Sequence, residues 1–337
     1  MIPHNDIIDR LLSHGSRPAA RVIDLAAAAE RVVADPVLAD RAIPAGDESL
    51  RDGFALAGLP ESLGKDTLTF TLAGEIAAGG QSNLPLQAGQ AWAVMTGAAV
   101  PPGTARVVPQ EFCRVVGRTV QISVRALAEG SAFLQTQGSM IRCGEELVGR
   151  GEVLSPARLE RLAAAGLTSL RVFRRPEVAY FCTGRELVAP GGMLFPGGKY
   201  SSNQFSLAAL ITRYGGSARS LGLISDEPQP LQEIFTRISS APPALLLSTG
   251  GTGPGRYDLV AEAFAAAGGF IEFHSLPMRP GNSVVFGWLG RMLFCGLPGP
   301  PWAVQTLFSA IVGPLLLGLH GVAGRWPMVV EALLAED

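Results

Sequence analysis

The chain has 337 residues, of which 47% are hydrophobic and 17% are charged, and its formal net charge is -2. This composition predicts a globular protein of two or three domains and argues against extended disorder. The chain has 27 basic and 29 acidic residues, and its basic residues do not cluster in the sequence, so nucleic acid is not expected as a partner. The four cysteines lie far apart and the four histidines form no ligand pattern, which argues against zinc and iron–sulfur sites.

The ends of the chain give no sign of secretion or membrane insertion. The first residues, MIPHNDIIDRLL, carry acids early and lack the long apolar core of a signal peptide. The most hydrophobic stretch, residues 303–320, is interrupted by Gln305, Ser309 and Pro314, which favours a buried core helix over a membrane span. We therefore expect a cytoplasmic protein with no membrane partner.

The first half of the chain mixes helical and β-prone segments. Helical spacing of apolar residues predicts helices over 6–14 and 22–34. Short β-prone segments separated by Gly and Pro turns follow at 68–72, 91–95, 105–108 and 120–124, which predicts a β-rich module. Ser155, Pro156 and Gly166 then predict the cap, first turn and end of a helix over 156–165.

From Glu177 onward, predicted strands alternate with predicted helices. The strands are expected at 178–182, 218–224, 244–247, 270–273, 284–286 and 292–295, and the helices at 204–214, 230–239, 259–267 and 303–320. This alternation predicts a doubly wound, mostly parallel sheet. Ligands in such sheets lie beyond the carboxyl ends of the strands, so the turns 183–186, 248–258 and 296–299 are expected to build one site.

The most informative motif is LLLSTGGTGPGRYDLV, residues 245–260, in which a short apolar run enters a glycine-rich turn. Glycines allow backbone N–H groups to approach an anion, and the following helix start adds a positive dipole. Asp258 brings a carboxylate to the position that a divalent metal would occupy. The motif predicts a phosphate-bearing ligand with a cation, and an ordinary strand–turn–helix connection is the alternative.

Nine segments, taken in order, resemble the motifs of the molybdopterin molybdenumtransferase family, the MoeA and gephyrin E-domain group. They are residues 47–55 (DESLRDGFA), 93–108 (AVMTGAAVPPGTARVV), 144–147 (GEEL), 182–187 (CTGREL), 201–203 (SSN), Asp226, 250–258 (GGTGPGRYD), 279–283 (RPGNS) and 296–303 (GLPGPPWA). The resemblance runs through nearly the whole chain.

This resemblance implies a multidomain α/β protein that forms a homodimer. A linking domain would hold residues 1–40 and 139–173, a β-rich lid would cover 41–138, and a molybdopterin-binding-like α/β domain would run over 174–325. Family members usually continue into a further β-rich domain, of which residues 326–337 would be a remnant or the start.

The resemblance also implies an enzyme of molybdenum cofactor biosynthesis. It would insert molybdate into adenylylated molybdopterin with Mg²⁺ and release AMP, and proteins that mature molybdenum enzymes are further candidate partners. The implied catalytic residues are Asp52, Glu186, Asp226 and Asp258, of which the last three would also bind the metal. The implied cofactor-binding residues are Thr96, Gly97, Thr183, Gly184, Ser202, Ser248, Gly250, Gly251, Gly253, Gly255, Arg279, Gly281, Asn282, Pro298 and Gly299.

Several positions depart from the family motifs. The lysine of the PGKP motif is Asn282, the asparagine of LPGNP is Pro300, the serine of GGVSVGD is Pro254 and the acid of TGDE is Arg185. Two alternative functions therefore stay open at this point. One is a non-catalytic relative that holds molybdopterin, the finished cofactor or a partner protein as a scaffold or carrier. The other is an α/β enzyme that acts on a different phosphorylated substrate.

Overall fold

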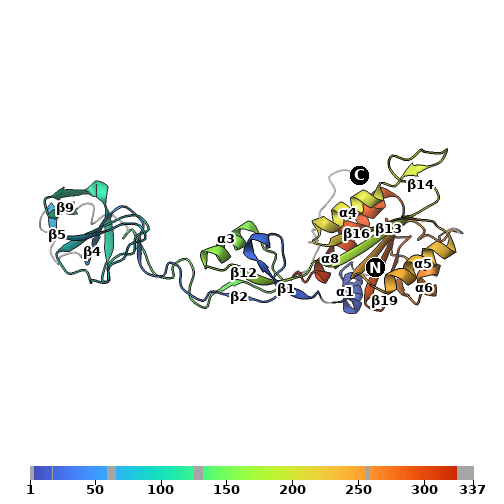
Figure 1. The fold of residues 1–337 in the computed structure, drawn as a ribbon, viewed down its shortest axis with the longest axis horizontal. Coiled ribbons are helices and arrows are strands. Elements are labelled where there is room, and N and C mark those ends of the chain that lie inside the picture. Colours follow the sequence, from blue (N-terminus) through green and yellow to red (C-terminus); the bar gives the residue numbers. More distant parts are fainter. Residues whose placement is uncertain (1–3, 17, 59–65, 125–131, 256–257, 325–337) are drawn as a thin grey trace. The chain divides into compact units, whose positions relative to one another are not determined.

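A computed structural model describes residues 4–16, 18–58, 66–124, 132–255 and 258–324 (Figure 1). The chain divides into two compact units. The β unit holds Val37–Leu147 with Glu160–Leu167, and the α/β unit holds the remaining residues. The predicted remnant over 326–337 lies outside the described residues, and the three-domain division stays a prediction.

The α/β unit is built on a six-stranded sheet with the order β16-β13-β17-β20-β19-β18. The first four strands of this order are parallel, and β19 and β18 run antiparallel at the far edge. This arrangement confirms the predicted doubly wound, mostly parallel sheet. The strands are β13 (Glu177–Thr183), β16 (Ser217–Ile224), β17 (Leu245–Thr249), β18 (Phe270–Phe273), β19 (Val285–Leu289) and β20 (Met292–Leu297).

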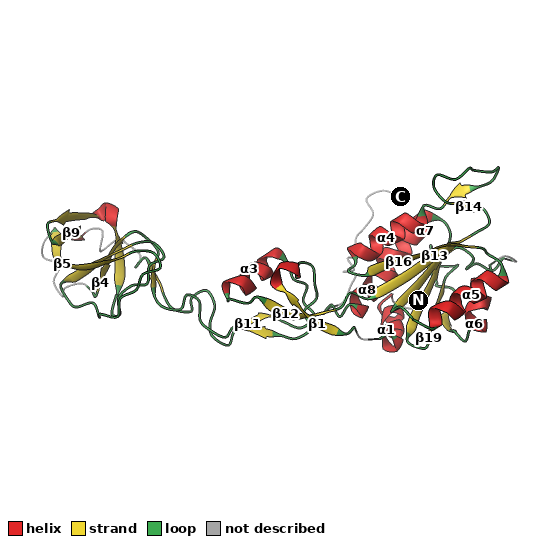
Figure 2. Ribbon diagram, in the orientation of Figure 1, coloured by secondary structure: helices red, strands yellow, loops and turns green. Residues whose placement is uncertain are grey.

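Helices cover both faces of this sheet (Figure 2). Alternate residues of β13 point to opposite faces, as a pleated strand requires: Val178 joins one core cluster and Ala179 the other. The first cluster includes α1 (His4–His14), α4 (Asn203–Arg213) and the C-terminal helix, and the second includes α5 (Pro228–Ser239) and α6 (Val260–Ala266). Helix α1 thus packs in the α/β core, although residues 1–40 are predicted to belong to a linking domain.

The predicted C-terminal helix is confirmed, with a change of winding in its middle. It consists of α7 (Pro301–Leu307), a π-helical turn η3 (Phe308–Val312) and α8 (Gly313–Leu319). Pro314 has no N–H to donate inside a helix, and wider π winding just before it accommodates the missing bond. Among the described helices, Pro301–Leu319 is long and apolar enough to cross a membrane, but 61% of its most apolar 18-residue window is buried, so packing in the core accounts for its composition.

The β unit contains a second six-stranded sheet with the order β7-β4-β6-β5-β9-β8, which confirms the β-rich prediction for this region. The strands are β4 (Gly53–Leu56), β5 (Thr67–Ile76), β6 (Gln90–Val94), β7 (Arg106–Pro109), β8 (Cys113–Val116) and β9 (Thr119–Ser123), with a short 3-10 turn η2 (Gln110–Phe112). Phe54 and Ala55 bury into separate apolar clusters on the two faces of this sheet. Strands β4 and β8 were not predicted.

Four short strand pairs complete the fold. β3 (Glu48–Ser49) pairs with β10 (Leu134–Gln135), β2 (Val37–Leu38) with β11 (Glu146–Val148), and β14 (Leu187–Val188) with β15 (Lys199–Tyr200). The fourth pair, β1 and β12, is described below. Helix α3 (Pro156–Ala164) confirms its prediction, because Ser155 Oγ accepts a bond from the Arg158 N–H at 3.4 Å and Gly166 follows with a φ of +85°.

The predicted helix over 22–34 is wrong. Residues Ala20–Asp24 form β1, which pairs antiparallel with β12 (Ser169–Phe173), and only Leu25–Ala27 wind into a 3-10 turn, η1. Val32 and Val33 make further β bridges, to Val153 and Val172. Pairing with distant segments and the β-branched valines therefore outweighs the helical propensity of the alanine-rich stretch.

Candidate functional site

The carboxyl ends of three neighbouring strands meet at one edge of the α/β sheet. In register, Cys182 of β13 lies opposite Thr249 of β17, and Thr249 lies opposite Leu297 of β20. The predicted turns 183–186 and 296–299 begin at these strand ends, and so does the described part of the predicted turn 248–258, which is residues 248–255 and Asp258. The structure therefore brings these segments to the same edge.

The glycine turn is held tightly against its neighbours. The Gly250 N–H donates to the Leu297 carbonyl at 2.9 Å, and the Val260 N–H donates to the Gly251 carbonyl at 3.1 Å. Gly250 has a φ of +88°, and a Cβ there would overlap the Thr183 carbonyl oxygen. Only glycine suits this position, because the backbone is left-handed and a neighbouring backbone lies against it.

The segment that carries Arg279, Gly281 and Asn282 is tied to the same turn. Thr252 Oγ1 donates to the Ser283 carbonyl at 2.8 Å, and Thr252 is only 2% exposed. Within the segment, the Leu276 N–H donates to the Gly281 carbonyl at 2.9 Å. Arg279 and Asn282 are both exposed, so their side chains remain accessible to a ligand at this edge.

Two of the predicted catalytic carboxylates, Asp258 and Glu186, lie against glycines of the turns that carry them. The Gly255 N–H donates to Asp258 Oδ2 at 2.8 Å, which holds this half-buried carboxylate across the glycine turn. The exposed Glu186 lies over Gly184, where an added Cβ would be 2.7 Å from Glu186 Oε2. Both carboxylates therefore accompany turns that meet at the strand-end edge.

The third predicted carboxylate, Asp226, forms an ion pair. Arg185 Nε donates to Asp226 Oδ1 at 3.1 Å. The Asp226 side chain is 13% exposed, and the Arg185 side chain is 60% exposed. An oxygen engaged by a guanidinium is a weaker ligand for a metal, so Asp258 and Glu186 are the better metal candidates.

The fit of these residues to Mg²⁺ depends on the number of protein ligands. Among the described residues, no three His, Cys, Asp or Glu side chains gather into a group that could hold a metal ion. Mg²⁺ is commonly bound by one or two carboxylates together with substrate phosphates and water. Asp258 and Glu186 fit that kind of site and do not fit a cage made by the protein alone.

Buried polar atoms without partners mark the same edge. Thr183 Oγ1, Ser248 Oγ and Asn203 Oδ1 have no hydrogen-bond partner within the described part of the chain, and their residues are 3%, 0% and 8% exposed. Leaving such an atom unpaired costs about 1–3 kcal/mol, so this cluster suits the binding of a polar ligand. Thr183 and Ser248 were predicted site residues, and the structure places both here.

The sequence analysis selected Ser202 in the SSN segment, whereas the structure turns its neighbour inward. Ser202 is exposed and makes no side-chain cap at the start of α4. Asn203 Nδ2 donates to the Gly299 carbonyl at 2.9 Å and so ties α4 to the predicted 296–299 turn. Asn203 belongs to the quoted SSN motif, which is the signal that could have identified it.

A buried thiol lies behind this edge. Burial raises the pKa of the Cys182 thiol, while hydrogen bonds with the Thr249 and Ser201 side chains act in the opposite direction. A thiol whose pKa is raised stays protonated and is a poor nucleophile. Cys182 therefore belongs to the packing of the site, and the structure gives it no chemical role.

The remaining predicted residues lie together in the β unit. Asp52 Oδ1 accepts two hydrogen bonds of 2.7 Å each, from the Thr96 N–H and from Thr96 Oγ1. These bonds, the backbone one first, hold the pKa of Asp52 below its usual value. Gly97 follows with a φ of +76°, and its N–H donates to the Ser49 carbonyl at 2.8 Å. These two hydrogen bonds favour the ionised form of the Asp52 carboxylate.

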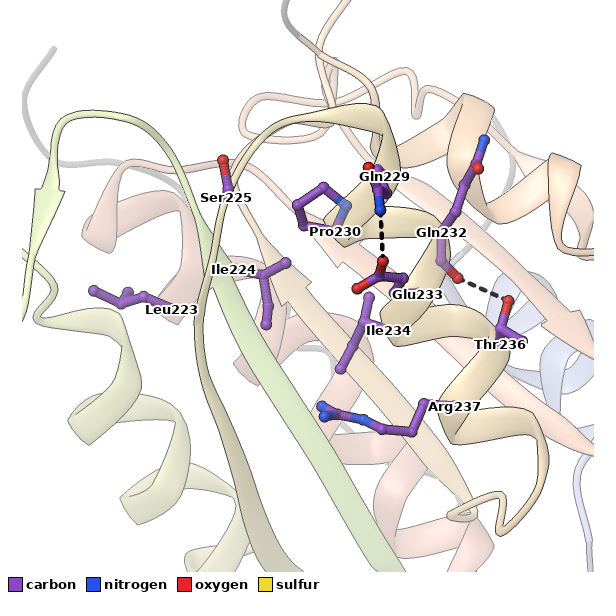
Figure 3. A pocket seen from close by; sticks show the side chains of 10 residues that line it. All are labelled: Leu223, Ile224, Ser225, Gln229, Pro230, Gln232, Glu233, Ile234, Thr236 and Arg237. Atoms are coloured by element: carbon purple, nitrogen blue, oxygen red, sulfur yellow. Dashed lines mark hydrogen bonds between the residues drawn. The ribbon is translucent and has the colours of Figure 1, made fainter.

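A groove of about 650 Å³ lies between the end of β16 and α5 (Figure 3). Its lining includes Ile224, Ser225 and Arg237, and a Gln229–Glu233 hydrogen bond of 3.0 Å crosses its helix side. None of the predicted site residues lines it, although Ser225 directly precedes Asp226. The groove therefore adjoins the strand-end site and does not coincide with it.

Two family models match the chain. Residues 2–166 match the MoeA N-terminal region (domain I and II), and residues 179–318 match the model described as "Probable molybdopterin binding domain". A molybdopterin molybdenumtransferase of Nostoc sp. is 32% identical over 327 residues, which are 96% of this chain and 74% of that relative. Another, of Haemophilus influenzae, is 29% identical over 89% of this chain and 72% of its own length.

Solved structures agree with the sequence relatives. Two crystal structures of the molybdopterin biosynthesis MoeA protein of Pyrococcus horikoshii superpose with TM-scores of 0.82 and 0.79, at 25% and 22% identity. Each alignment covers 96% of this chain, and 81% and 80% of the respective solved chain. The similarity therefore extends over both units and across nearly the whole described fold.

Proposed function

Because the chain belongs to the molybdopterin molybdenumtransferase (MoeA) family, we propose that it inserts molybdate into adenylylated molybdopterin and releases AMP. The observation that carries this proposal is the strand-end edge of the α/β sheet. There the Gly250 turn, Asp258 and Glu186 lie with three buried polar atoms that have no hydrogen-bond partner among the described residues. A phosphate-bearing substrate needs such a combination of backbone donors and carboxylates.

In this proposal, some residues at this edge bind the anionic substrate and others bind the metal ion. Backbone N–H groups of residues 251–253, together with Thr183, Ser248 and Asn203, would bind and orient polar groups of the pterin substrate. Asp258 and Glu186 would hold Mg²⁺. When bound, the metal ion supplies positive charge to the phosphate groups and the oxoanion. Water adds across the phosphoanhydride bond of the adenylylated substrate as that bond breaks, so the pterin keeps its own phosphate and AMP leaves.

Residues of the β unit contribute a further carboxylate in this proposal. The pKa of Asp52 is lowered by its bonds from Thr96, so Asp52 is charged at neutral pH and acts as a hydrogen-bond acceptor.

We further propose that the protein is a cytoplasmic homodimer, which light scattering of the full chain would test. Passing the product to proteins that mature molybdenum enzymes also belongs to this proposal.

A single-turnover assay tests the reaction. Full-length protein is mixed with adenylylated molybdopterin, Mg²⁺ and molybdate, and AMP release is followed over time. Asp258→Asn is the sharpest variant, because the amide oxygen can still accept the Gly255 N–H while the negative charge is lost. We expect molybdate-dependent AMP release by the wild type and a loss of at least about 100-fold in the variant.

The controls separate chemistry from folding. Glu272→Gln removes a carboxylate that pairs with Arg10 at 2.8 Å and lies outside the predicted site, and it should leave the rate unchanged. Wild-type protein that binds the substrate without molybdate-dependent AMP release would contradict the proposed reaction. It would favour the carrier or scaffold alternative instead.

A further inference from the structure

Arg31 is a cation that the α/β unit encloses almost completely. The residue is only 8% exposed, and its Nη2 donates to the Phe173 carbonyl at 2.8 Å, which anchors one end of the guanidinium at the end of β12. The Arg31 Nε is buried and has no hydrogen-bond partner within the described part of the chain. Burial of a charge is strongly unfavourable unless an ion of opposite charge accompanies it. Arg31 therefore calls for an anion.

The charges that act on Arg31 are those of other cations. Burial first, and then the charges of Arg21 and Arg175, lower the pKa of Arg31. Both of these arginines are exposed, and neither side chain makes a hydrogen bond or an ion pair with the described residues. Three guanidiniums thus share one region of the α/β unit and repel one another. Because two of them reach the surface, ions from solvent have access to the region.

A buried imidazole belongs to the same region. His320, which follows α8, is 1% exposed, and its Nε2 has no hydrogen-bond partner among the residues that the structure describes. Burial, followed by the charges of Arg31 and Arg175, lowers the pKa of His320 to about 4. The imidazole is therefore neutral at pH 7, and the positive charge of the region resides on the arginines.

The acidic residues that neighbour this region along the chain do not neutralise it. Asp35 and Glu177 already form ion pairs with other arginines. Asp24 and Glu30 are exposed and form no ion pair with any described residue. Within the described ranges, Arg31 therefore has no carboxylate as counter-ion.

The region lies at the opposite end of the sheet from the strand-end site. Arg175 comes two residues before β13, whose last residue is Thr183. A strand of seven residues, such as β13, spans about 20 Å. A ligand held by the arginines would therefore not touch one bound at the Gly250 turn.

We propose that Arg21, Arg31 and Arg175 form a binding site for an oxoanion of the phosphate class. The anion supplies the missing negative charge and accepts N–H bonds from the guanidiniums, whose planar forks match pairs of oxoanion oxygens. His320 offers Nε2 as an uncharged hydrogen-bond partner. The bound anion thereby links the end of β12 to the end of α8 and stabilises the folded unit.

Thermal unfolding of the full-length protein near neutral pH tests for such a site. Sodium phosphate is compared with sodium chloride at matched ionic strength, because a general salt effect would act in both. We expect the melting temperature to rise with phosphate concentration, as it does for a ligand that binds only the folded state, and to respond much less to chloride. Equal responses to the two salts would overturn the proposal.

Variants of the two exposed arginines locate the site. Arg21→Ala and Arg175→Ala truncate exposed side chains and should each weaken phosphate, in calorimetric titrations, by about 10-fold or more. Arg237→Ala is the matched control, because Arg237 is an exposed arginine on α5, which packs on the other face of the sheet from α8. Unchanged affinity in both test variants, or an equal loss in Arg237→Ala, would overturn the proposal.

The same titrations identify the form of the phosphate group. AMP is titrated into the wild type and Arg175→Ala beside sodium phosphate. Weakening of both ligands would show that the site accepts a phosphate ester, whereas weakening of inorganic phosphate alone would restrict it to the free ion. Either result supports an oxoanion site at the arginines.

Carboxylates of the chain itself are the competing counter-ions. Glu331, Glu336 and Asp337 lie outside the described residues. The combined replacement Glu331→Gln, Glu336→Gln and Asp337→Asn removes these charges, and we expect it to leave the affinity for phosphate unchanged. A gain of about 10-fold or more would show that these carboxylates already occupy the site, and would overturn an oxoanion as its occupant.

Discussion

At the scale of single residues, the bond network of Asp52 sets its ionisation. The Thr96 N–H and then the Thr96 hydroxyl lower the pKa of Asp52. We expect Thr96→Val, which keeps the N–H and loses the hydroxyl, to raise this pKa while leaving it below the ordinary value. Thr96→Ser keeps both donors and should change little. Carbon-13 NMR titration, with the Asp52 signal assigned through Asp52→Asn, measures the shift, and an unmoved pKa in Thr96→Val would refute the account.

His320 gives a second prediction at this scale, concerning the dependence of stability on pH. Burial first, and then the charges of Arg31 and Arg175, lower the pKa of His320 from 6.5 to about 4. The unfolded chain therefore takes up a proton below pH 6.5 that the folded chain excludes. The stability that neutral His320 contributes is present above pH 6.5 and falls as the pH drops to 4, by about 3 kcal/mol at most.

Urea unfolding at pH 7.5 and pH 5 checks this. We expect the free energy of unfolding to fall between the two values in the wild type, and to fall less in His320→Gln. Because both proteins share the same carboxylates, the difference between their pH dependences isolates the histidine. Equal losses in the two proteins would show that His320 titrates normally.

At the scale of elements, the glycine turn makes the most specific demand. Gly250→Ala would put a methyl group against the Thr183 carbonyl in a left-handed backbone. We expect it to cost at least about 2 kcal/mol and to weaken substrate binding. Gly191→Ala is the matched control: its φ is +90° but nothing lies within 4 Å of the added Cβ, so only about 1–2 kcal/mol of backbone strain remains. Chemical denaturation of both variants compares them, and equal losses would argue against the clash.

Most elements of the α/β unit could be predicted because their signals are local. Apolar runs such as 178–182 and 244–247 alternate along the sequence with amphipathic segments. The structure has strands at these runs and helices between the strands. The segment 22–34 failed because its partner strand β12 lies more than a hundred residues away, and local alanine content carries no trace of that pairing. Strand β4 was missed because its four residues are all buried and show no alternation.

For the site, too, the local features could be predicted from the sequence and the contacts between distant residues could not. Glycine and acid patterns located all three turns, since a turn is specified by its own residues. The Arg185–Asp226 pair and the Asn203–Gly299 bond could not be derived, because they join residues 41 and 96 positions apart. Such contacts depend on strand order and register, which a single sequence does not state.

At the scale of the whole molecule, the two units have separate cores. Phe235 is fully buried in the α/β unit, with its ring 5.4 Å from those of Phe264 and Phe294. We expect Phe235→Ala to destabilise that unit by about 3–5 kcal/mol. Hydrogen exchange should show lost protection in β13 and β17 and unchanged protection in β5 and β9. Phe205→Ala, at a 63% exposed ring on α4, is the control, and loss of protection in both units would show that they unfold as one.

One of the two outermost strands of the α/β sheet, β16, also bears on how copies of the protein can associate. β16 has β13 on one side only, and such an open edge invites another chain to pair with it. Two features oppose this. Arg219 carries a charge along the strand, where it pairs with Glu177, and the register slips beside Gly222, whose φ is +85°. A kinked, charged edge is a poor template for continuous pairing. We therefore expect the protein to resist aggregation through this edge, and any stable dimer to use another surface.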